Sequence, residues 1–347
     1  MNLEKLFNFD ILIEFFMKLL IVGGAGYIGS HMVKALVNSG HDVIILDNLS
    51  TGFRELALYG ELVVGDLVDE NLLNDLFSKH QFDGVMHFAA ASLVGESMTN
   101  PAKYYRNNVS NTINLLDAMV KYDVKSFVFS SSAAVYGEPN SDLIDETHAK
   151  EPINPYGSTK LMIERILKDY ASAYDLNSIS LRYFNACGAD PEGELGECHD
   201  PETHLIPLIL QAASGRRESI TVFGRDYATD DGTCVRDYIH INDLCAAHAL
   251  ALDKLTASND CRALSYNLGN SSGFSVQQVI DVVQTVVSKD GYSVTVEGGE
   301  RRAGDPATLV ADATKAKVEL DWQPEYDGLE TIVSHAWAWE KKLAKID

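Results

Sequence analysis

Short apolar runs alternate with longer segments of helical period through the first half of the chain. The runs include LLIV, DVIILD, ELVV, GVMHFAA, SFVFSSS and SISLRYF. Strands that are apolar along their whole length are covered on both faces, so this alternation predicts a parallel sheet between two layers of helices. The predicted fold class is α/β, a doubly wound parallel sheet of the Rossmann type.

The pattern changes after residue 187. The segment GADPEGELGECHDPETH, residues 188–204, is polar and predicts a long loop. Beyond it, helical periodicity covers 205–213, 240–255 and 275–289, and strand-like runs cover 219–224 and 292–298. We therefore expect an N-terminal extension over 1–16, a first domain over 17–186, and a smaller C-terminal α/β region over 187–347 from which some segments return to the first domain.

Composition narrows the classes of partner and compartment. Asp and Glu outnumber Lys and Arg by 50 to 28, and the net charge of -22 argues against a nucleic acid or an anionic membrane as partner. No apolar stretch has the length of a membrane span. Residues 1–16 are apolar, but acidic residues interrupt them, so a signal peptide is not predicted. The five cysteines are an odd number without CxxC spacing, which favours reduced thiols and a cytoplasmic location.

A glycine-rich loop follows the first predicted strand. GGAGYIG, residues 23–29, stands where that strand meets a helix, and glycines there permit close approach to a pyrophosphate at the helix N-terminus. Asp47 ends the next strand, about twenty residues on, where a carboxylate can accept hydrogen bonds from an adenosine ribose. A carboxylate repels a 2′-phosphate, so the predicted cofactor is NAD rather than NADP.

Polar and small residues end the following strands. Asp66 ends the third, where it could bind the cofactor or cap the next helix. Phe88, Ala89 and Ala90 end the fourth, at the edge where ligands bind in this architecture, although Phe88 could equally be a core residue. The serine run ending at Ser132 could form a turn or relay a proton.

Tyr156 and Lys160 lie one helical turn apart in NPYGSTK. Residues at this spacing share a helix face, so the phenol and the ammonium can point at one object. On its own, such a pair is more often a solvated helix surface. Beside a bound nicotinamide, the lysine ammonium and the positive nicotinamide ring would both favour phenolate, so we expect the pKa of Tyr156 to fall towards neutrality as base catalysis requires.

Together, the dinucleotide-type loop, Ser132 and the YxxxK pair resemble the extended short-chain dehydrogenase/reductase superfamily. LRYFNACGADP, VFGRDYATDDGTCVRDYIHINDL, YNLGN and RRAGDPA follow in order, and with GGAGYIGSH they resemble the UDP-glucose 4-epimerase family. The resemblance runs from about Lys18 to Trp339. It implies reversible inversion at C4 of a UDP-hexose through a transient 4-keto sugar, with hydride passing to and from tightly bound NAD.

The resemblance also implies the site residues. The catalytic residues would be Tyr156 as acid/base, Lys160 tuning it, and Ser132 hydrogen-bonding the 4-hydroxyl. Cofactor contacts would come from Gly23, Gly26, Tyr27, Ile28, Gly29, Asp47, Asn48, Asp66, Leu67, Phe88, Ala89, Ala90, Asn107, Tyr156, Lys160 and Phe184. Substrate contacts would come from Ser132, Tyr156, Asn185, His204, Leu205, Phe223, Arg236, Arg302, Asp305 and Leu309.

Other functions of the superfamily stay open. A dehydratase typically has an Asp-Glu pair just after the serine or threonine that ends the fifth strand, which is Ser132 here. This chain has Ala133 and Ala134 in place of that pair. UDP-glucuronate or UDP-N-acetylhexosamine epimerisation is an alternative, as is a non-catalytic NAD-binding protein. Ser92 replaces a lysine that some epimerases place near the cofactor. Leu309 stands where the size of the side chain restricts the sugar in the family, and its intermediate size leaves amino-sugar activity open, with the plain hexose preferred.

Histidines and helices raise two further questions. Cys198, His199 and His204 match no zinc spacing that would carry a metal assignment, so no metal is predicted. His240 and His248 are placed on one helix as partly buried, hydrogen-bonded residues. Helices over 101–121 and 155–173 could form the helix bundle through which the family commonly dimerises, so a homodimer is expected.

Overall fold

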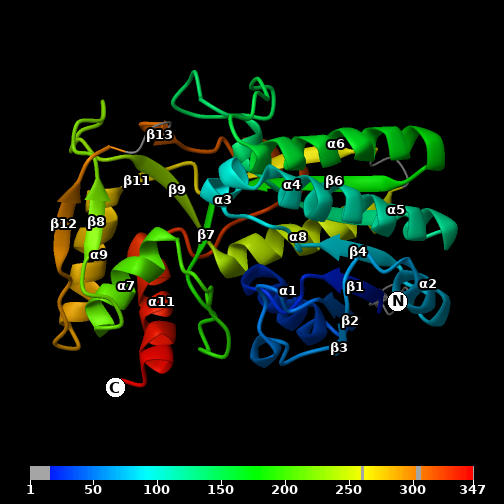
Figure 1. Ribbon diagram of the computed structural model, residues 1–347, viewed down its shortest axis with the longest axis horizontal. Helices are drawn as coiled ribbons and strands as arrows, with labels where there is room; N and C mark the ends of the chain where they lie inside the picture. The colour runs from blue at the N-terminus through cyan, green and yellow to red at the C-terminus, as the bar shows by residue number, and fades with distance from the viewer. Residues whose placement is uncertain (1–15, 259–261, 302–305, 347) are drawn as a thin grey trace, which may run out of the picture.

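A parallel seven-stranded sheet forms the larger part of the molecule. The computed structural model describes residues 16–258, 262–301 and 306–346 (Figure 1). The strand order is β10-β6-β5-β4-β1-β2-β3. The strands are β1 (Lys18–Val22), β2 (Asp42–Asp47), β3 (Glu61–Val64), β4 (Gly84–His87), β5 (Ser126–Ser132), β6 (Asn177–Tyr183) and β10 (Leu264–Leu268).

Helices cover both faces of this sheet. Leu19 and Ile21 of β1 pack with α1 (Tyr27–Asn38), α8 (Ile241–Ala257) and α10 (Thr314–Glu319) on one face. Leu20 and Val22 pack with α2 (Glu70–Lys79), α5 (Asn111–Lys121) and α6 (Pro155–Tyr174) on the other. Consecutive residues of one strand therefore serve opposite cores, which is why its sequence is apolar without interruption. The predicted doubly wound α/β class is confirmed.

The strand order reverses between β1 and β4. The chain runs outward from β1 to β2 and β3, then crosses back to β4 on the other side of β1. At such a switch point the connections leave in opposite directions and open a crevice at the carboxyl ends of the strands. Gly23 lies there with φ +83°, and a Cβ on it would stand 2.5 Å from the backbone nitrogen of Ala89. The start of the glycine loop thus lies directly against the end of β4.

A smaller lobe lies at the left of Figure 1. In it β8 (Ile220–Phe223) pairs with β12 (Val296–Gly299), and β9 (Val235–His240) pairs with β7 (Asn185–Cys187), β11 (Gly273–Ser275) and β13 (Thr308–Leu309). Its core gathers residues of α7 (Leu205–Ser214), α9 (Val276–Ser288) and α11 (Leu329–Ala344). α8 and β10 follow residue 187 in the chain yet pack with the large sheet. The division at residue 186 stays a prediction.

Several local expectations need correction. His240 is not a helix residue: it ends β9 and its Nδ1 accepts from Asn242 as the N-cap of α8. The segment expected as one helix over 101–121 is α4 (Pro101–Tyr104), a π-helical stretch over Tyr105–Ser110 and α5. The remaining short elements are α3 (Val94–Thr99) and the 3-10 turns Arg54–Leu56 and Ala133–Val135.

The structure bears in different ways on the expected N-terminal extension and on the expected lack of a membrane span. The N-terminal extension lies almost wholly outside the described residues, which begin at 16. Within the described ranges, no helix combines the length and apolar character that crossing a bilayer requires.

Candidate active site

Ser132 and Tyr156 meet at the carboxyl end of β5. Ser132 is the last residue of β5, and α6 begins at Pro155 with the side chain of Asn154 accepting from the Gly157 N–H at 2.8 Å. A Cβ on Gly157 would stand 2.3 Å from the carbonyl oxygen of Ala134, so the start of α6 lies directly on the segment after β5. The Ser132 hydroxyl is thereby placed near the Tyr156 phenol, close enough to lower the pKa of the phenol as a hydrogen-bonding neighbour.

Lys160 lies one turn along α6, on the same side. Its side chain is buried, and Nζ donates to the carbonyl oxygen of Ser130 at 2.7 Å. The same nitrogen lies 5.8 Å from the centre of the Tyr156 ring and 5.0 Å from that of Phe129. The structure therefore brings together the three residues that the sequence proposed as catalytic.

Burial dominates the pKa values of Tyr156 and Lys160 in the chain alone. Burial raises the pKa of Tyr156, and the hydrogen bond with Ser132 only partly opposes it. Burial also lowers the pKa of Lys160 to about 7, against the opposing charge of Glu164. The phenol pKa is therefore not lowered in the chain alone, because the effect of burial outweighs that of Ser132, and the lowering expected with a bound nicotinamide stays a prediction.

Two buried polar residues, not predicted from the sequence, fix the position of α6. Asn108, in the π-helical stretch, donates to the carbonyl oxygen of Ala91 and to the hydroxyl of Thr159, each at 3.0 Å, and accepts from the Ala91 N–H at 2.8 Å. Thr159 is the residue before Lys160. Asn108 thus joins the loop after β4 to the catalytic turn of α6, and the π-helical geometry is typical of such functional positions.

A buried ion pair lies one further turn along α6. Arg182 of β6 donates to both carboxylate oxygens of Glu164, at 2.8 and 2.6 Å, and Ser131 donates to the same carboxylate at 2.7 Å. Both charged side chains are almost inaccessible. This pair holds α6 against the two strands that end beside the catalytic residues.

The glycine loop forms a cradle at the start of α1. Gly26 is the N-cap of α1 and provides no side-chain cap, so the first N–H groups of the helix face the switch-point crevice. Gly29 has no room for a Cβ, which would stand 2.1 Å from the carbonyl oxygen of Gly23. Tyr27 is buried in the first turn, and Ile28 beside it is half-buried.

Asp47 and Asp66 lie beyond this cradle. Asp47 accepts from the backbone of Ala25 at 2.9 Å, which ties it to the glycine loop. Asp66 accepts from Asn48 at 2.6 Å and does not cap α2, since Asp69 does so. Asp47 therefore lies beside the glycine loop, and the contacts of both carboxylates with a dinucleotide stay a prediction.

The other proposed cofactor residues are spread around the same crevice. Phe88 packs 4.9 Å from the His248 ring against the core, which favours the structural reading of this residue. The half-buried residues Ala89, Ala90 and Asn107 lie nearby, while Leu67 is buried in the core and Phe184 packs beside Leu161. An uncapped helix start, a backbone-tied carboxylate and an open strand edge fit a nicotinamide dinucleotide.

A cavity of about 320 Å³ lies in the smaller lobe, between β7, β8, β9 and α7. Five of the proposed substrate residues line it: Asn185, His204, Leu205, Phe223 and Arg236. Leu309 does not line the cavity, but it pairs with Arg236 across β13 and β9 and packs against the apolar cluster that contains Tyr136 and Leu161. Arg302 and Asp305 lie outside the described residues. The cavity has the size and mixed lining expected for part of a nucleotide.

The family model of the NAD dependent epimerase/dehydratase family matches residues 19–269. The chain belongs to this family. A UDP-glucose 4-epimerase of Halalkalibacterium halodurans is 50% identical over 326 residues, which are 94% of this chain and 96% of the relative. One from Lacticaseibacillus casei is 46% identical, over 94% of this chain and 97% of the relative.

Solved structures of the family agree closely with this epimerase-family chain. A UDP-glucose 4-epimerase crystal structure matches with a TM-score of 0.91 at 49% identity, covering 95% of this chain and 99% of that one. The Brucella ovis enzyme in complex with NAD matches with a TM-score of 0.88 at 47% identity, over 92% and 97%. The resemblance to UDP-glucose 4-epimerases is confirmed, and with it the predicted enzyme class and NAD dependence.

Proposed function

We propose that this chain interconverts UDP-glucose and UDP-galactose by inverting C4, with Tyr156 as the acid/base. The observation that carries the proposal is the meeting of Ser132, Tyr156 and Lys160 at the switch-point crevice, beside a cradle that fits a dinucleotide. NAD, when bound, supplies the hydride acceptor and donor at C4. The chain itself must move one proton and hold the sugar.

The proton transfer is assigned to the Ser132–Tyr156 hydrogen bond. A sugar hydroxyl within reach of both oxygens can pass its proton to Tyr156 while Ser132 accepts and donates in turn. Because burial raises the pKa of the free phenol, Tyr156 needs a positive neighbour to act as base. Lys160 can supply that charge. Because its pKa is about 7, a modest change in its surroundings is enough to protonate it fully.

The nucleotide is assigned to the cavity beside α7. Leu205 and Phe223 offer apolar surface for a uracil ring, and Asn185 and Arg236 offer polar groups for ribose and diphosphate. Arg302 and Asp305 are proposed to complete the phosphate and ribose contacts. A firm grip on the diphosphate leaves the hexose free to present either face to the same catalytic groups.

The plain hexose is the preferred substrate. Leu309 is partly buried against the apolar cluster that contains Tyr136 and Leu161, so an N-acetyl group at this wall would displace packed side chains. Ala133 and Ala134 form the turn after Ser132, in place of the acidic pair of a dehydratase. Epimerisation without elimination is therefore the reaction that these residues favour.

We also infer a homodimer, a cytoplasmic location and a role in galactose metabolism. Met98 of α3 and Met162 of α6 are 61% and 40% exposed, and the two helices pack against each other, so they form an apolar face suited to a second copy. Cys187, Cys198, Cys234 and Cys245 are free thiols, which suits a reducing compartment. Inversion at C4 links galactose to glucose metabolism.

Conservative variants of the catalytic pair test the proposal. Tyr156→Phe should keep NAD bound after gel filtration and lose at least about a hundredfold in the rate of UDP-galactose conversion, because proton transfer typically contributes that much. Normal turnover by this variant would show that another group is the base. Ser132→Ala should retain more activity than Tyr156→Phe, since it removes only a relay.

A further inference from the structure

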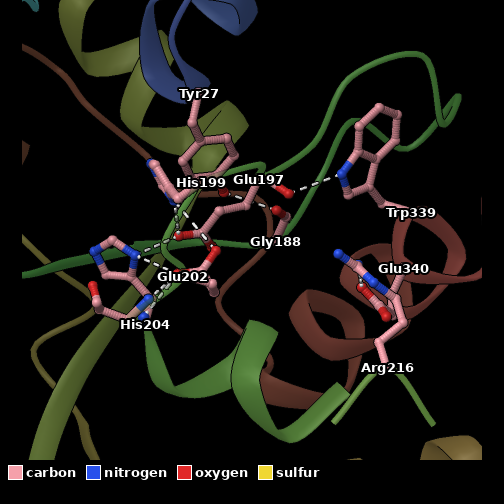
Figure 2. A network of polar contacts seen from close by, with 10 residues as sticks. Tyr27, Gly188, Glu197, His199, Glu202, His204, Arg216, Trp339 and Glu340 are labelled. Carbon is pink, nitrogen blue, oxygen red and sulfur yellow. Dashed lines mark hydrogen bonds and ion pairs between the residues drawn. The ribbon is translucent and has the colours of Figure 1, made fainter. Parts of the chain in front are cut away.

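Four residues of the loop before α7 bring their side chains to one point. They are Glu197, His199, Glu202 and His204, and their ligand atoms all lie within 4.8 Å of one another (Figure 2). The sequence indicated only Cys198, His199 and His204, which match no zinc spacing. The fold replaces the cysteine with two glutamates, one on either side of His199 in the chain.

The distances in this cluster are close to those of a tetrahedral site. The Nδ1 atom of His199 lies 3.3 Å from an oxygen of each glutamate, and that of His204 lies 2.8 and 3.0 Å from them. Ligands bound at about 2.0–2.1 Å in a tetrahedron stand about 3.3 Å apart. The four histidine–glutamate separations therefore lie within a few tenths of an ångström of that value.

Burial and charge single out this cluster. The side chains of Glu197 and Glu202 are only 6% and 5% exposed, although carboxylates are almost never so buried without a positive partner. In the described part of the chain, their ion-pair partners are the two imidazoles. The nearby Arg216 pairs instead with Glu340, at 2.8 Å (Figure 2).

A second acidic group in the same loop shows the contrast. Asp190, Glu192 and Glu194 also converge, but the ammonium of Lys34 lies between them at 2.9, 2.6 and 2.9 Å. That group contains a lysine ammonium, which cannot ligate a metal. In the histidine–glutamate cluster the positive partners are the imidazoles themselves: burial opposes their charge, but Glu197 and Glu202 raise the pKa of His199 to about 9 and that of His204 to about 10, so a bound ion would displace those protons. The histidine–glutamate cluster offers two carboxylates and two imidazole nitrogens, which ligate a metal in their neutral form. This is the donor set of a divalent transition ion.

We propose that Glu197, His199, Glu202 and His204 bind one Zn²⁺-type divalent ion as a structural site. Four protein ligands leave no open position, so the site is structural rather than catalytic. Its two carboxylates balance the ion's charge and leave both imidazoles neutral. Metal binding itself does not depend on the activity proposed above.

The surroundings of the site explain what the ion would hold. The His199 ring meets Tyr27 of the cofactor loop edge-on at 6.2 Å, and the Tyr27 hydroxyl donates to Gly188 at 2.8 Å. The indole of Trp339 in α11 donates to the Glu197 carbonyl at 2.9 Å. His204 lines the proposed nucleotide cavity and directly precedes α7. The ion would therefore fix one wall of that cavity against the cofactor loop and α11.

Cobalt replacement tests the site on the full chain. Protein stripped with a chelator and titrated with Co²⁺ should bind one ion per chain and show the intense visible absorption of four-coordinate Co²⁺. His199→Gln and Glu202→Gln should each weaken Co²⁺ binding by at least about tenfold. Stripped wild-type protein should show a higher KM for UDP-galactose with a nearly unchanged kcat.

Two variants in the same loop serve as controls. Cys198→Ser lies between two of the ligands and should leave the spectrum and affinity unchanged. Glu192→Gln, in the second acidic group, should do the same. If stripped wild-type protein gave no four-coordinate spectrum, or if His199→Gln bound Co²⁺ as tightly as wild type, the two histidines would instead be imidazoliums paired with the glutamates, and the metal proposal would be overturned.

Discussion

Replacing Glu164 by Gln should destabilise the protein strongly, although Glu164 is not proposed to touch the substrate. The change removes the charge that faces Arg182 across two hydrogen bonds of 2.8 and 2.6 Å. The Arg182 side chain is 3% exposed, so its charge would stay buried without a counter-charge. Breaking a buried pair from one side typically costs 3–5 kcal/mol. Because Gln can still accept from Ser131 and from one guanidinium N–H, we expect about 3 kcal/mol.

Urea unfolding measures this loss, and the chain offers a matched control. Lys289 and Glu330 form an ion pair at 2.8 Å whose side chains are 61% and 63% exposed. Solvent screens such a pair, so Glu330→Gln should unfold at the wild-type urea concentration. The comparison isolates burial, because both variants make the same chemical change to an ion-paired glutamate.

A double variant separates charge from packing. Glu164→Leu with Arg182→Met removes both charges and keeps apolar volume, so its stability should lie nearer to wild type than that of Glu164→Gln. Two results would refute the reasoning. One is a Glu164→Gln chain as stable as the Glu330→Gln control, and the other is a double variant no more stable than Glu164→Gln.

The remaining predictions concern pH, specificity and assembly. Burial lowers the pKa of His87 to about 3 and that of His248 to about 4, so the unfolded chain binds more protons than the folded chain below pH 6.5. The free energy of unfolding should therefore fall between pH 6.5 and 4, by up to about 1.4 kcal/mol per pH unit for each histidine. His248→Gln should make the urea midpoint less dependent on pH over this range. Leu309→Ala should raise kcat/KM for UDP-N-acetylgalactosamine relative to UDP-galactose by about tenfold, and an unchanged ratio would remove Leu309 from the specificity wall. Met162→Glu should convert the dimer to monomer in light scattering, whereas an unaltered mass would place the interface elsewhere.

The large sheet and the cofactor cradle followed from local sequence signals. A strand buried on both faces needs an unbroken apolar run, as β1 and β2 have, and the tight turn after β1 requires glycine at Gly23, where φ is +83°. Asp47 ends β2 and lies beside that turn. Each signal depends on residues that are neighbours in the chain, so the sequence displays it directly.

The features that escaped prediction depend on contacts between distant residues. Asn108 contacts Thr159 across 51 positions, and the helix around it reads as ordinary until the π-helical geometry is seen. His240 fits a helical pattern but ends β9, since pairing with β7 outweighs local periodicity. Burial raises the pKa of Tyr156 in the chain without NAD, and the extent of that burial is set by the whole fold.

Direct conversion of the sugar is the measurement that tests the central claim. Purified protein with its bound NAD should convert UDP-galactose to UDP-glucose without added reductant, approach the same mixture from either sugar, and leave the NAD content unchanged. Tyr156→Phe, prepared in parallel with NAD bound, should leave either sugar almost unconverted. No conversion by NAD-loaded wild-type protein, or conversion that consumes added cofactor in proportion to product, would contradict the account.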